Sequence, residues 1–98
     1  METLRTYADR IGLVHFKDWH PARAAESVAN EEDYFAAVAR GVFCLLGEGA
    51  VDFQGVVDAL RQQGYAGWIT VEQDVLPGMG DPKACAAANR AFLKGFGL

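Results

Sequence analysis

Two short apolar runs in this sequence each end in side chains that can bind a cation or transfer a proton. The first run, residues 12–19, contains His15, Lys17 and Asp18 toward its end. In the second run, Glu72 directly follows Trp-Ile-Thr-Val. An imidazole beside carboxylates is a common ligand set for divalent Mn, Co, Zn or Mg. Such an ion, next to a substrate carbonyl or hydroxyl, stabilises the enolate formed when a neighbouring C–H proton is removed. The chemistry therefore depends on whether His15 and Glu72 meet.

Each candidate also has a structural interpretation. Lys17 and Asp18 can bind substrate or move a proton, but a mutual salt bridge or a solvated loop explains them equally well. A single histidine at a strand end is more often a hydrogen-bonded structural group than a ligand. A carboxylate such as Glu72 is harder to dismiss, because burying it after an apolar strand is costly without a partner. The two main candidates supply only two ligands, and His20 and Asp74 are the next ones.

The two runs predict strands of a parallel sheet. Both are apolar on both faces, which is typical of strands covered by helices. Because side chains alternate along a strand, one direction is shared by the following residues: Leu13, His15 and Lys17 in the first run, and Trp68, Thr70 and Glu72 in the second. The carboxyl ends of parallel strands meet on one face of a sheet. If these directions are inward, His15 and Glu72 both point to the mouth of the sheet.

The remaining pattern predicts helices between three strands, too few for a closed barrel. The expected elements are a short helix within 2–10, a strand over 10–16, a long loop over 18–30, a helix over 30–40 capped by Asn30, a short strand or buried extended segment over 42–46, a helix over 53–63 capped by Asp52, a strand over 68–72, a loop over 73–80, and a last helix opened by Asp81 and Pro82. The helix over 30–40 is expected to bury Tyr34, Phe35 and Val38.

The other polar, aromatic and glycine residues that could bind a ligand have structural interpretations. His20 is expected to be solvated, Glu48 to lie in a turn, and the rings of Trp19 and Trp68 to pack. The Gly-x-Gly sequence at 47–49 lacks the rest of a phosphate-binding pattern, so it does not predict a nucleotide loop.

Composition narrows the class of protein. The chain has 98 residues, 51% of them hydrophobic and 22% charged, which fits one small globular domain over 1–98. Its net charge of −4 disfavours nucleic acid and anionic membranes as partners. Cys44 and Cys85 have apolar neighbours and are expected to be reduced thiols. No signal peptide or membrane-spanning run is recognised, which points to the cytoplasm.

The whole chain resembles the xylose-isomerase-like TIM barrels, which are grouped with the type 2 AP endonucleases and sugar isomerases and epimerases. The segments that carry the resemblance are RIGLVHFKD (10–18), FAAVARGVF (35–43), GEGAVDF (47–53), GYAGWITVEQD (64–74) and NRAFL (89–93). Within this superfamily, the combination of these segments, including the insertion between the histidine strand and the Gly-x-Gly turn, looks most like the inosose dehydratase branch. Its members are lyases of inositol catabolism that remove water from 2-keto-myo-inositol.

The resemblance implies a role for each candidate residue. His15 matches the metal-binding histidine that ends the sixth barrel strand, and Glu72 the metal-binding glutamate that ends the eighth. Lys17 and Asp18 match a pair with a substrate-side, catalytic role. The expected cofactor is a divalent metal (Mn, Co, Zn or Mg), and the expected substrate is a sugar or cyclic polyol ketone.

The resemblance also implies that this chain is the carboxyl-terminal portion of a (β/α)8 barrel, roughly its last third. The family's further metal ligands, a Glu and an Asp, come from earlier strands that this sequence does not contain. Open sheet edges and an apolar face favour association, so we expect a homo-oligomer or a fragment of a longer product. Two functions are therefore alternatives. The first is a lyase or isomerase that is inactive as an isolated fragment, and the second is a non-catalytic barrel remnant that self-associates through its open sheet.

Overall fold

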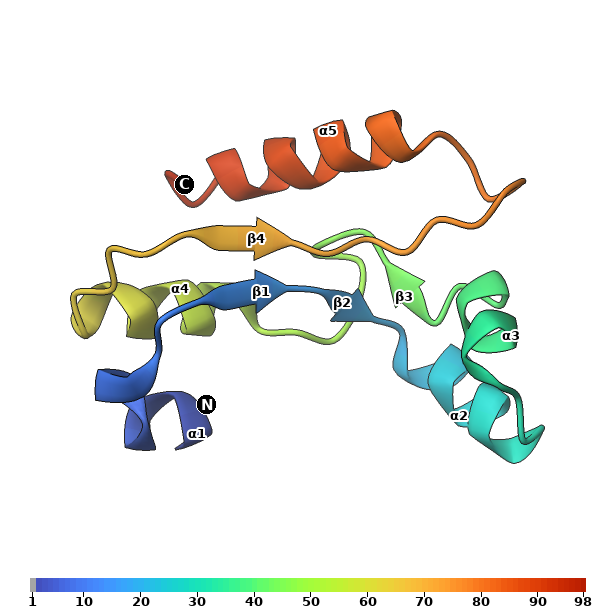
Figure 1. Cartoon of the computed structure of the whole chain (residues 1–98), viewed down its shortest axis with the longest axis horizontal. Coiled ribbons are helices and arrows are strands. Elements are labelled where there is room, and N and C mark those ends of the chain that lie inside the picture. The colour runs from blue at the N-terminus through green and yellow to red at the C-terminus, as the bar shows by residue number, and fades with distance from the viewer. Residues whose placement is uncertain (1) are drawn as a thin grey trace.

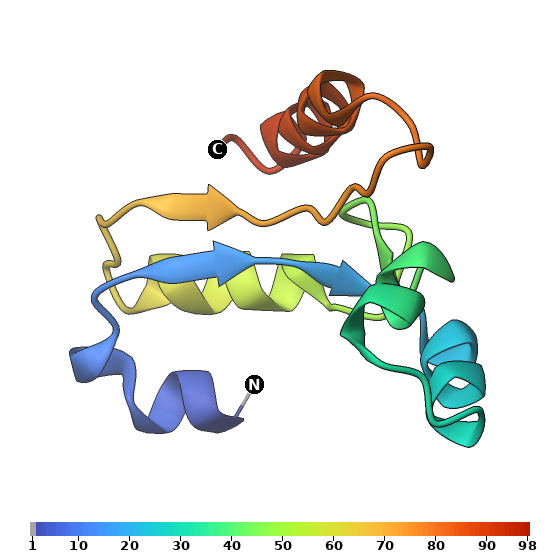
Figure 2. The same cartoon turned by 45° about the vertical axis from the view of Figure 1, so that its right-hand side comes forward.

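The computed structural model describes residues 2–98 and has helices on both sides of a small central sheet (Figure 1). Its elements in chain order are α1 (Glu2–Thr6), the 3-10 helix η1 (Ala8–Arg10), β1 (Val14–Phe16), β2 (Asp18–Trp19), α2 (Pro21–Ala29), α3 (Tyr34–Ala39), β3 (Phe43–Cys44), α4 (Phe53–Gln62), β4 (Ile69–Val71) and α5 (Pro82–Lys94). Figure 2 shows α2 and α3 beyond the arrowheads of β1 and β4, at the carboxyl end of the sheet.

The central sheet is the parallel pair β1 and β4. Val14 pairs with Ile69, His15 with Thr70 and Phe16 with Val71. The predicted parallel relation of the two chemistry-bearing strands is therefore confirmed. The same register puts alternate residues of both strands on the same face, because the side-chain period of a strand is two.

The core lies between the sheet and the helices α4 and α5. It consists of six buried hydrophobic residues: Phe16, Leu46, Phe53, Val57, Leu60 and Leu93. The ring of Phe53 lies 5.2 Å from that of Phe16, measured between centroids, and 5.6 Å from that of Phe92, so one aromatic residue of α4 joins the strand to α5.

Both predicted caps of these helices are present. The side chain of Asp52 accepts from the backbone N–H of Gly55 at 2.9 Å, and that of Asp81 from Lys83 at 3.1 Å, with Pro82 in the first turn. These contacts bind N–H groups that have no partner inside the helix.

The prediction of three parallel strands is wrong in one respect. The segment over 42–46 forms β3, which pairs antiparallel with β2 in a separate two-stranded sheet. After β3, backbone N–H groups donate hydrogen bonds to side chains and therefore do not pair with another strand. Leu46 donates to Asn89 Oδ1 at 2.9 Å, and Gly47 and Gly49 donate to Asp18. Two of the three predicted strands thus form the parallel sheet.

The predicted long loop over 18–30 is also wrong, since residues Pro21–Ala29 form α2. Pro21 occupies the first helical turn, where a residue without an N–H loses no hydrogen bond. The carbonyl of His20 accepts from the N–H of Ala24 at 3.0 Å and begins the helix. The alanine-rich sequence that follows has high helix propensity. Proline here starts a helix.

The helix predicted over 30–40 begins later than expected. Asn30 ends α2, Glu31 has a left-handed backbone with φ of 51°, and Asp33 caps α3 by accepting from Ala36 N–H at 2.8 Å. The shifted start changes the buried face. Val38 is buried as expected, but Tyr34 and Phe35 are exposed.

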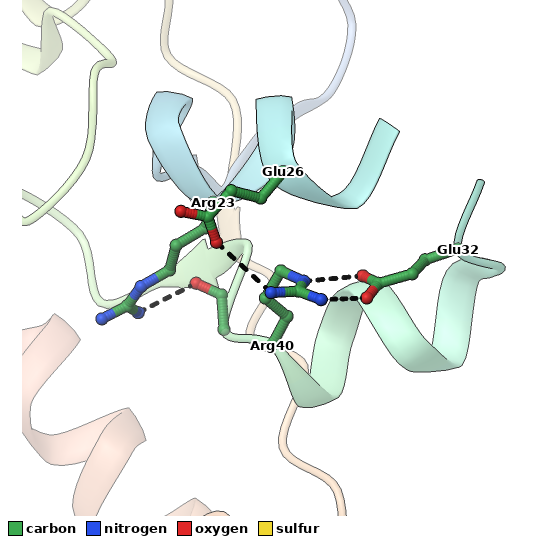
Figure 3. Close-up of polar contacts among 5 residues, drawn as sticks. Arg23, Glu26, Glu32 and Arg40 are labelled. Atoms are coloured by element: carbon green, nitrogen blue, oxygen red, sulfur yellow. Dashed lines mark hydrogen bonds and ion pairs between the residues drawn. The ribbon is translucent and has the colours of Figure 1, made fainter. Parts of the chain in front are cut away.

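Ion pairs hold α2 against α3. The guanidinium of Arg40, just after α3, binds both carboxylate oxygens of Glu32 and reaches Glu26 of α2 at 3.3 Å (Figure 3). Arg23 of α2 donates to the carbonyl of Gly41 at 3.1 Å. These contacts join the two helices into one unit, which we call the α2–α3 insertion (residues 21–39).

One face of the parallel sheet carries exposed apolar side chains within residues 2–98. Trp68 is 85% exposed and Leu13 62% exposed. The expectation that both tryptophan rings pack is therefore wrong, because Trp19 is also exposed. Across the same residues, no helix is both long and apolar enough to cross a membrane.

Candidate metal and substrate site

The parallel register brings His15 and Glu72 together at the carboxyl end of the sheet. The backbone N–H of Glu72 donates to the carbonyl of Phe16 at 2.9 Å and so continues the ladder one residue past β4. His15 Nδ1 lies 3.8 Å from Glu72 Oε2, and each side chain is about half exposed, 51% and 46% respectively. The two residues singled out in the sequence are thus neighbours that solvent can reach.

Lys17 occupies the other side of Glu72. Its Nζ lies 2.7 Å from Glu72 Oε1 and 2.5 Å from Asp74 Oδ2, and 4.0 Å from the centre of the Phe43 ring. Burial alone would lower the pKa of Lys17, but the hydrogen bonds to Asp74 and Glu72 outweigh it and raise the pKa above its usual value. A mutual salt bridge between Lys17 and Asp18, one of the alternatives that the sequence left open, is not formed, since Lys17 pairs with Glu72 and Asp74.

Asp74 and Tyr34 complete the polar cluster. Tyr34 Oη donates to Asp74 Oδ2 at 2.9 Å. Burial alone would raise the pKa of Asp74, but the hydrogen bonds from Lys17 and Tyr34 hold it below its usual value. The sequence offered Asp74 as a further candidate, two residues after Glu72. It gave no signal for Tyr34, which reaches the site only because the α2–α3 insertion folds back over the end of the sheet.

Asp18 is fully buried and has a different set of partners. Its Oδ2 accepts from the N–H groups of Gly47 and Gly49 at 2.9 and 3.0 Å, and its Oδ1 from those of Val51 and Trp19 at 3.1 and 2.9 Å. A Cβ on Gly49 would lie 2.3 Å from Asp18 Oδ1. The carboxylate predicted to face substrate therefore organises the turn over 47–51, and a substrate in the mouth of the sheet does not reach it.

His20, the other sequence candidate, does not join the cluster. Its backbone N–H donates to the carbonyl of Val42 at 2.8 Å. Its Nδ1 is buried and has no hydrogen-bond partner within the described residues, so the expectation of a solvated ring is wrong.

Comparison with known proteins identifies the family. Residues 1–95 match the model of the family described as xylose isomerase-like TIM barrel. The chain belongs to this family. The direct parallel pairing of β1 with β4 is consistent with two consecutive strands of a barrel. The expectation that these strands are the sixth and the eighth is therefore wrong, because no strand of the described residues lies between them.

Three relatives of this xylose isomerase-like chain share one name. Proteins called inosose dehydratase from Serratia proteamaculans, Histophilus somni and Lacticaseibacillus casei are 35%, 32% and 34% identical to it. The alignments cover 96%, 96% and 89% of this chain, but 32%, 32% and 29% of the relatives. The chain therefore spans about a third of the length of the curated relatives it matches.

The residues of this barrel segment fit one half of a metal site. Two ligands bound to one ion at about 2.1 Å each lie at most about 4.2 Å apart, and the 3.8 Å between His15 Nδ1 and Glu72 Oε2 falls within that limit. Within residues 2–98, however, no group of three or more His, Cys, Asp or Glu side chains is placed to hold an ion. His15 and Glu72 can supply two ligands to an ion, and the described residues place no third ligand beside them.

Proposed function

We propose that this chain carries the carboxyl-terminal half of the metal site of a lyase or isomerase of the inosose dehydratase type. Its substrate would be a sugar or cyclic polyol ketone, and its cofactor a divalent Mn, Co, Zn or Mg ion held in part by His15 and Glu72. The observation that carries the proposal is the 3.8 Å approach of these two side chains at the carboxyl ends of adjacent parallel strands. Barrel enzymes keep their active sites at that end of the sheet.

The side chains at the mouth of the sheet would have separate roles in such a reaction. The ion, when bound, stabilises negative charge that develops on a substrate oxygen as a neighbouring C–H proton leaves. The ammonium of Lys17, held by Glu72 and Asp74, would donate a hydrogen bond to a substrate oxygen. Asp18 acts as a positioning residue: it fixes the turn over 47–51 against β2 and thereby the end of β1 from which Lys17 projects.

The segment on its own is expected to bind metal weakly and to show no turnover. Two protein ligands leave most of the coordination of a divalent ion to water. The remaining ligands would come from the part of the barrel that this chain does not span, which corresponds to the other two thirds of its relatives.

Manganese binding tests the site directly. Mn²⁺ titrated into the 98-residue chain and followed by electron paramagnetic resonance should show one weak site. That site should be lost in His15→Ala and Glu72→Gln. His20→Ala is the matched control, because His20 is the other histidine of the chain and lies outside the cluster. Equal Mn²⁺ binding by wild type and His15→Ala would refute the proposed ligand.

Complementation tests the activity. The portion of the Serratia proteamaculans relative that precedes the aligned region, mixed or co-expressed with this chain, should dehydrate inosose when Mn²⁺ is present. The same mixture with His15→Ala should be inactive. Equal activity in the two mixtures would contradict the role of His15.

A second candidate function is association without catalysis. In the described residues β1 and β4 each have one unpaired edge, and a groove of about 470 Å³ between β4 and α5 is lined mainly by apolar residues, including Trp68, Ile69 and Leu93. A second copy of the chain would cover these edges and the exposed Trp68 ring. Light scattering after size exclusion should then give at least twice the mass of 10.6 kDa. A stable monomer at every concentration would reject this candidate.

A further inference from the structure

Lys17 is shared between two carboxylates that have different surroundings. Glu72 has one oxygen on Lys17, at 2.7 Å, and the other turned toward His15, at 3.8 Å. Asp74 has its Oδ2 on Lys17 at 2.5 Å and also accepts from Tyr34 at 2.9 Å. One ammonium group therefore bridges an acid of the candidate metal site and an acid beside it.

A divalent ion at His15 and Glu72 conflicts with this arrangement. The ion and the ammonium of Lys17 would be like charges on the two oxygens of one carboxylate, and like charges at such distances repel strongly. The ion also withdraws negative charge from Glu72, which weakens the attraction of Glu72 for Lys17. Either Lys17 then moves away from Glu72, or its charge weakens the binding of the ion.

Beside Asp74 the ammonium of Lys17 can stay paired with an acid without contacting Glu72. Asp74 already bonds Lys17, so the ammonium needs only to give up Glu72 to be paired with Asp74 alone. The hydroxyl of Tyr34 donates to the same Asp74 oxygen that Lys17 contacts and helps to fix that carboxylate. The ring of Phe43, 4.0 Å from Nζ, presents its face to the cation and favours the same position.

We propose that Asp74 is a positioning residue that holds the ammonium of Lys17 clear of Glu72 when Glu72 binds a divalent cation. This inference rests on the proposed metal site. It assigns to Asp74, and through it to Tyr34, a part in metal binding without contact between either residue and the metal. Loss of Asp74 would leave Lys17 with Glu72 as its one acidic partner, and Lys17 would then compete with the ion.

A double-mutant cycle on Mn²⁺ affinity tests this role. The wild type, Asp74→Asn, Lys17→Met and the double variant are titrated with Mn²⁺ and followed by electron paramagnetic resonance. Asp74→Asn should weaken Mn²⁺ binding roughly threefold, the size of effect expected for partly exposed charge pairs. Lys17→Met should strengthen it by a similar factor. In the Lys17→Met background, Asp74→Asn should change the affinity no more than Glu48→Gln does.

Glu48 is the matched control because it lines the same hollow as Asp74 but forms no ion pair with Lys17. Its substitution measures the general effect of removing one negative charge near the mouth of the sheet. Circular dichroism checks the fold of each variant, and Lys17→Gln replaces Lys17→Met if the latter does not fold.

The possible results separate the inference from the function on which it rests. If Asp74→Asn weakens binding equally with and without Lys17, Asp74 is itself a ligand and the inference is overturned. If Asp74→Asn has no more effect than Glu48→Gln in the presence of Lys17, it is overturned as well, while the metal site stands. If neither wild type nor Lys17→Met binds Mn²⁺, the metal site and the inference both fail.

Discussion

Lys17 and Asp18 are adjacent in the sequence but serve opposite sides of the chain. Lys17 reaches Glu72 and Asp74 at the partly exposed mouth of the sheet, whereas Asp18 is buried beneath the turn over 47–51. The alternation of an extended backbone explains the division, since successive side chains point to opposite faces. One residue of the pair is available for chemistry, and the other supports the structure from which the first projects.

The burial of Asp18 predicts a large loss of stability on substitution. Asp18→Ala removes the acceptor of four backbone N–H groups, and a buried donor without a partner costs about 1–3 kcal/mol. We expect urea unfolding to show a loss on the order of 3 kcal/mol. The exposed acid Asp9 supplies the control: Asp9→Asn should change the free energy of unfolding by less than about 0.5 kcal/mol.

The turn over 47–51 predicts that glycine is required at position 49. In Gly49→Ala the added Cβ would lie 2.3 Å from Asp18 Oδ1 and 2.4 Å from the carbonyl oxygen of Trp19. Neither atom can move without breaking the turn, so thermal unfolding should show a loss of about 2 kcal/mol or more. Gly12→Ala, where no atom lies within 4 Å of the new Cβ, should leave the melting temperature nearly unchanged.

The shifted start of α3 predicts a contrast between two phenylalanines. Phe53 is buried in the core, and Phe53→Ala should cost about 3–5 kcal/mol in the free energy of unfolding. Phe35 is 66% exposed, and Phe35→Ala should cost less than about 0.5 kcal/mol. Chemical denaturation of both variants measures the contrast. Equal losses would mean that Phe35 is buried after all.

The Arg40 contacts predict a pH-dependent stability of the α2–α3 insertion. The hydrogen bond from Arg40 holds the pKa of Glu32 below its ordinary value of 4.5. A carboxyl whose pKa is lowered by folding contributes fully above its unfolded pKa and loses that contribution as pH falls through the folded one. Hydrogen exchange of α2 and α3 should therefore be slow at pH 6 and become faster, relative to the core, below about pH 4.5.

An Arg40→Gln variant provides the control for this pH dependence. Without the guanidinium, Glu32 loses the main cause of its lowered pKa, and only the hydrogen bond with Ser27 still lowers it. The difference between wild type and Arg40→Gln should be present at pH 6 and should shrink as the pH falls below 4. A difference that is constant with pH would exclude the Glu32 carboxylate as its source.

The features that the sequence predicted correctly depend on short-range rules. Asp52 and Asp81 cap helices because their side chains bind N–H groups only a few residues away. The meeting of His15 and Glu72 follows from the period of two in each strand and the parallel pairing, both readable from apolar runs. The buried position of Val38 follows from its helical spacing, even though the helix starts later than expected.

The features that the sequence did not predict depend on contacts between distant segments. Apart from its neighbour Trp19, the partners of Asp18 lie 29 to 33 residues later. The local sequence around Asp18 therefore predicts only a charged residue that faces solvent or substrate. Tyr34 and Asp74 are 40 residues apart and meet through the placement of a whole helix. The sequence over 18–30 predicts a loop because it has no sustained helical period, and the helix that begins at Pro21 is therefore not visible from the pattern.

The turn over 47–51 has a consequence for anion binding by this chain. Successive N–H groups that point into one concavity form an anion-binding nest of the kind that receives phosphate in other proteins. Here the chain fills the nest with its own carboxylate, that of Asp18. The turn therefore has no free N–H groups to offer to a phosphate, and any affinity of this chain for a phosphate ester has to come from other residues.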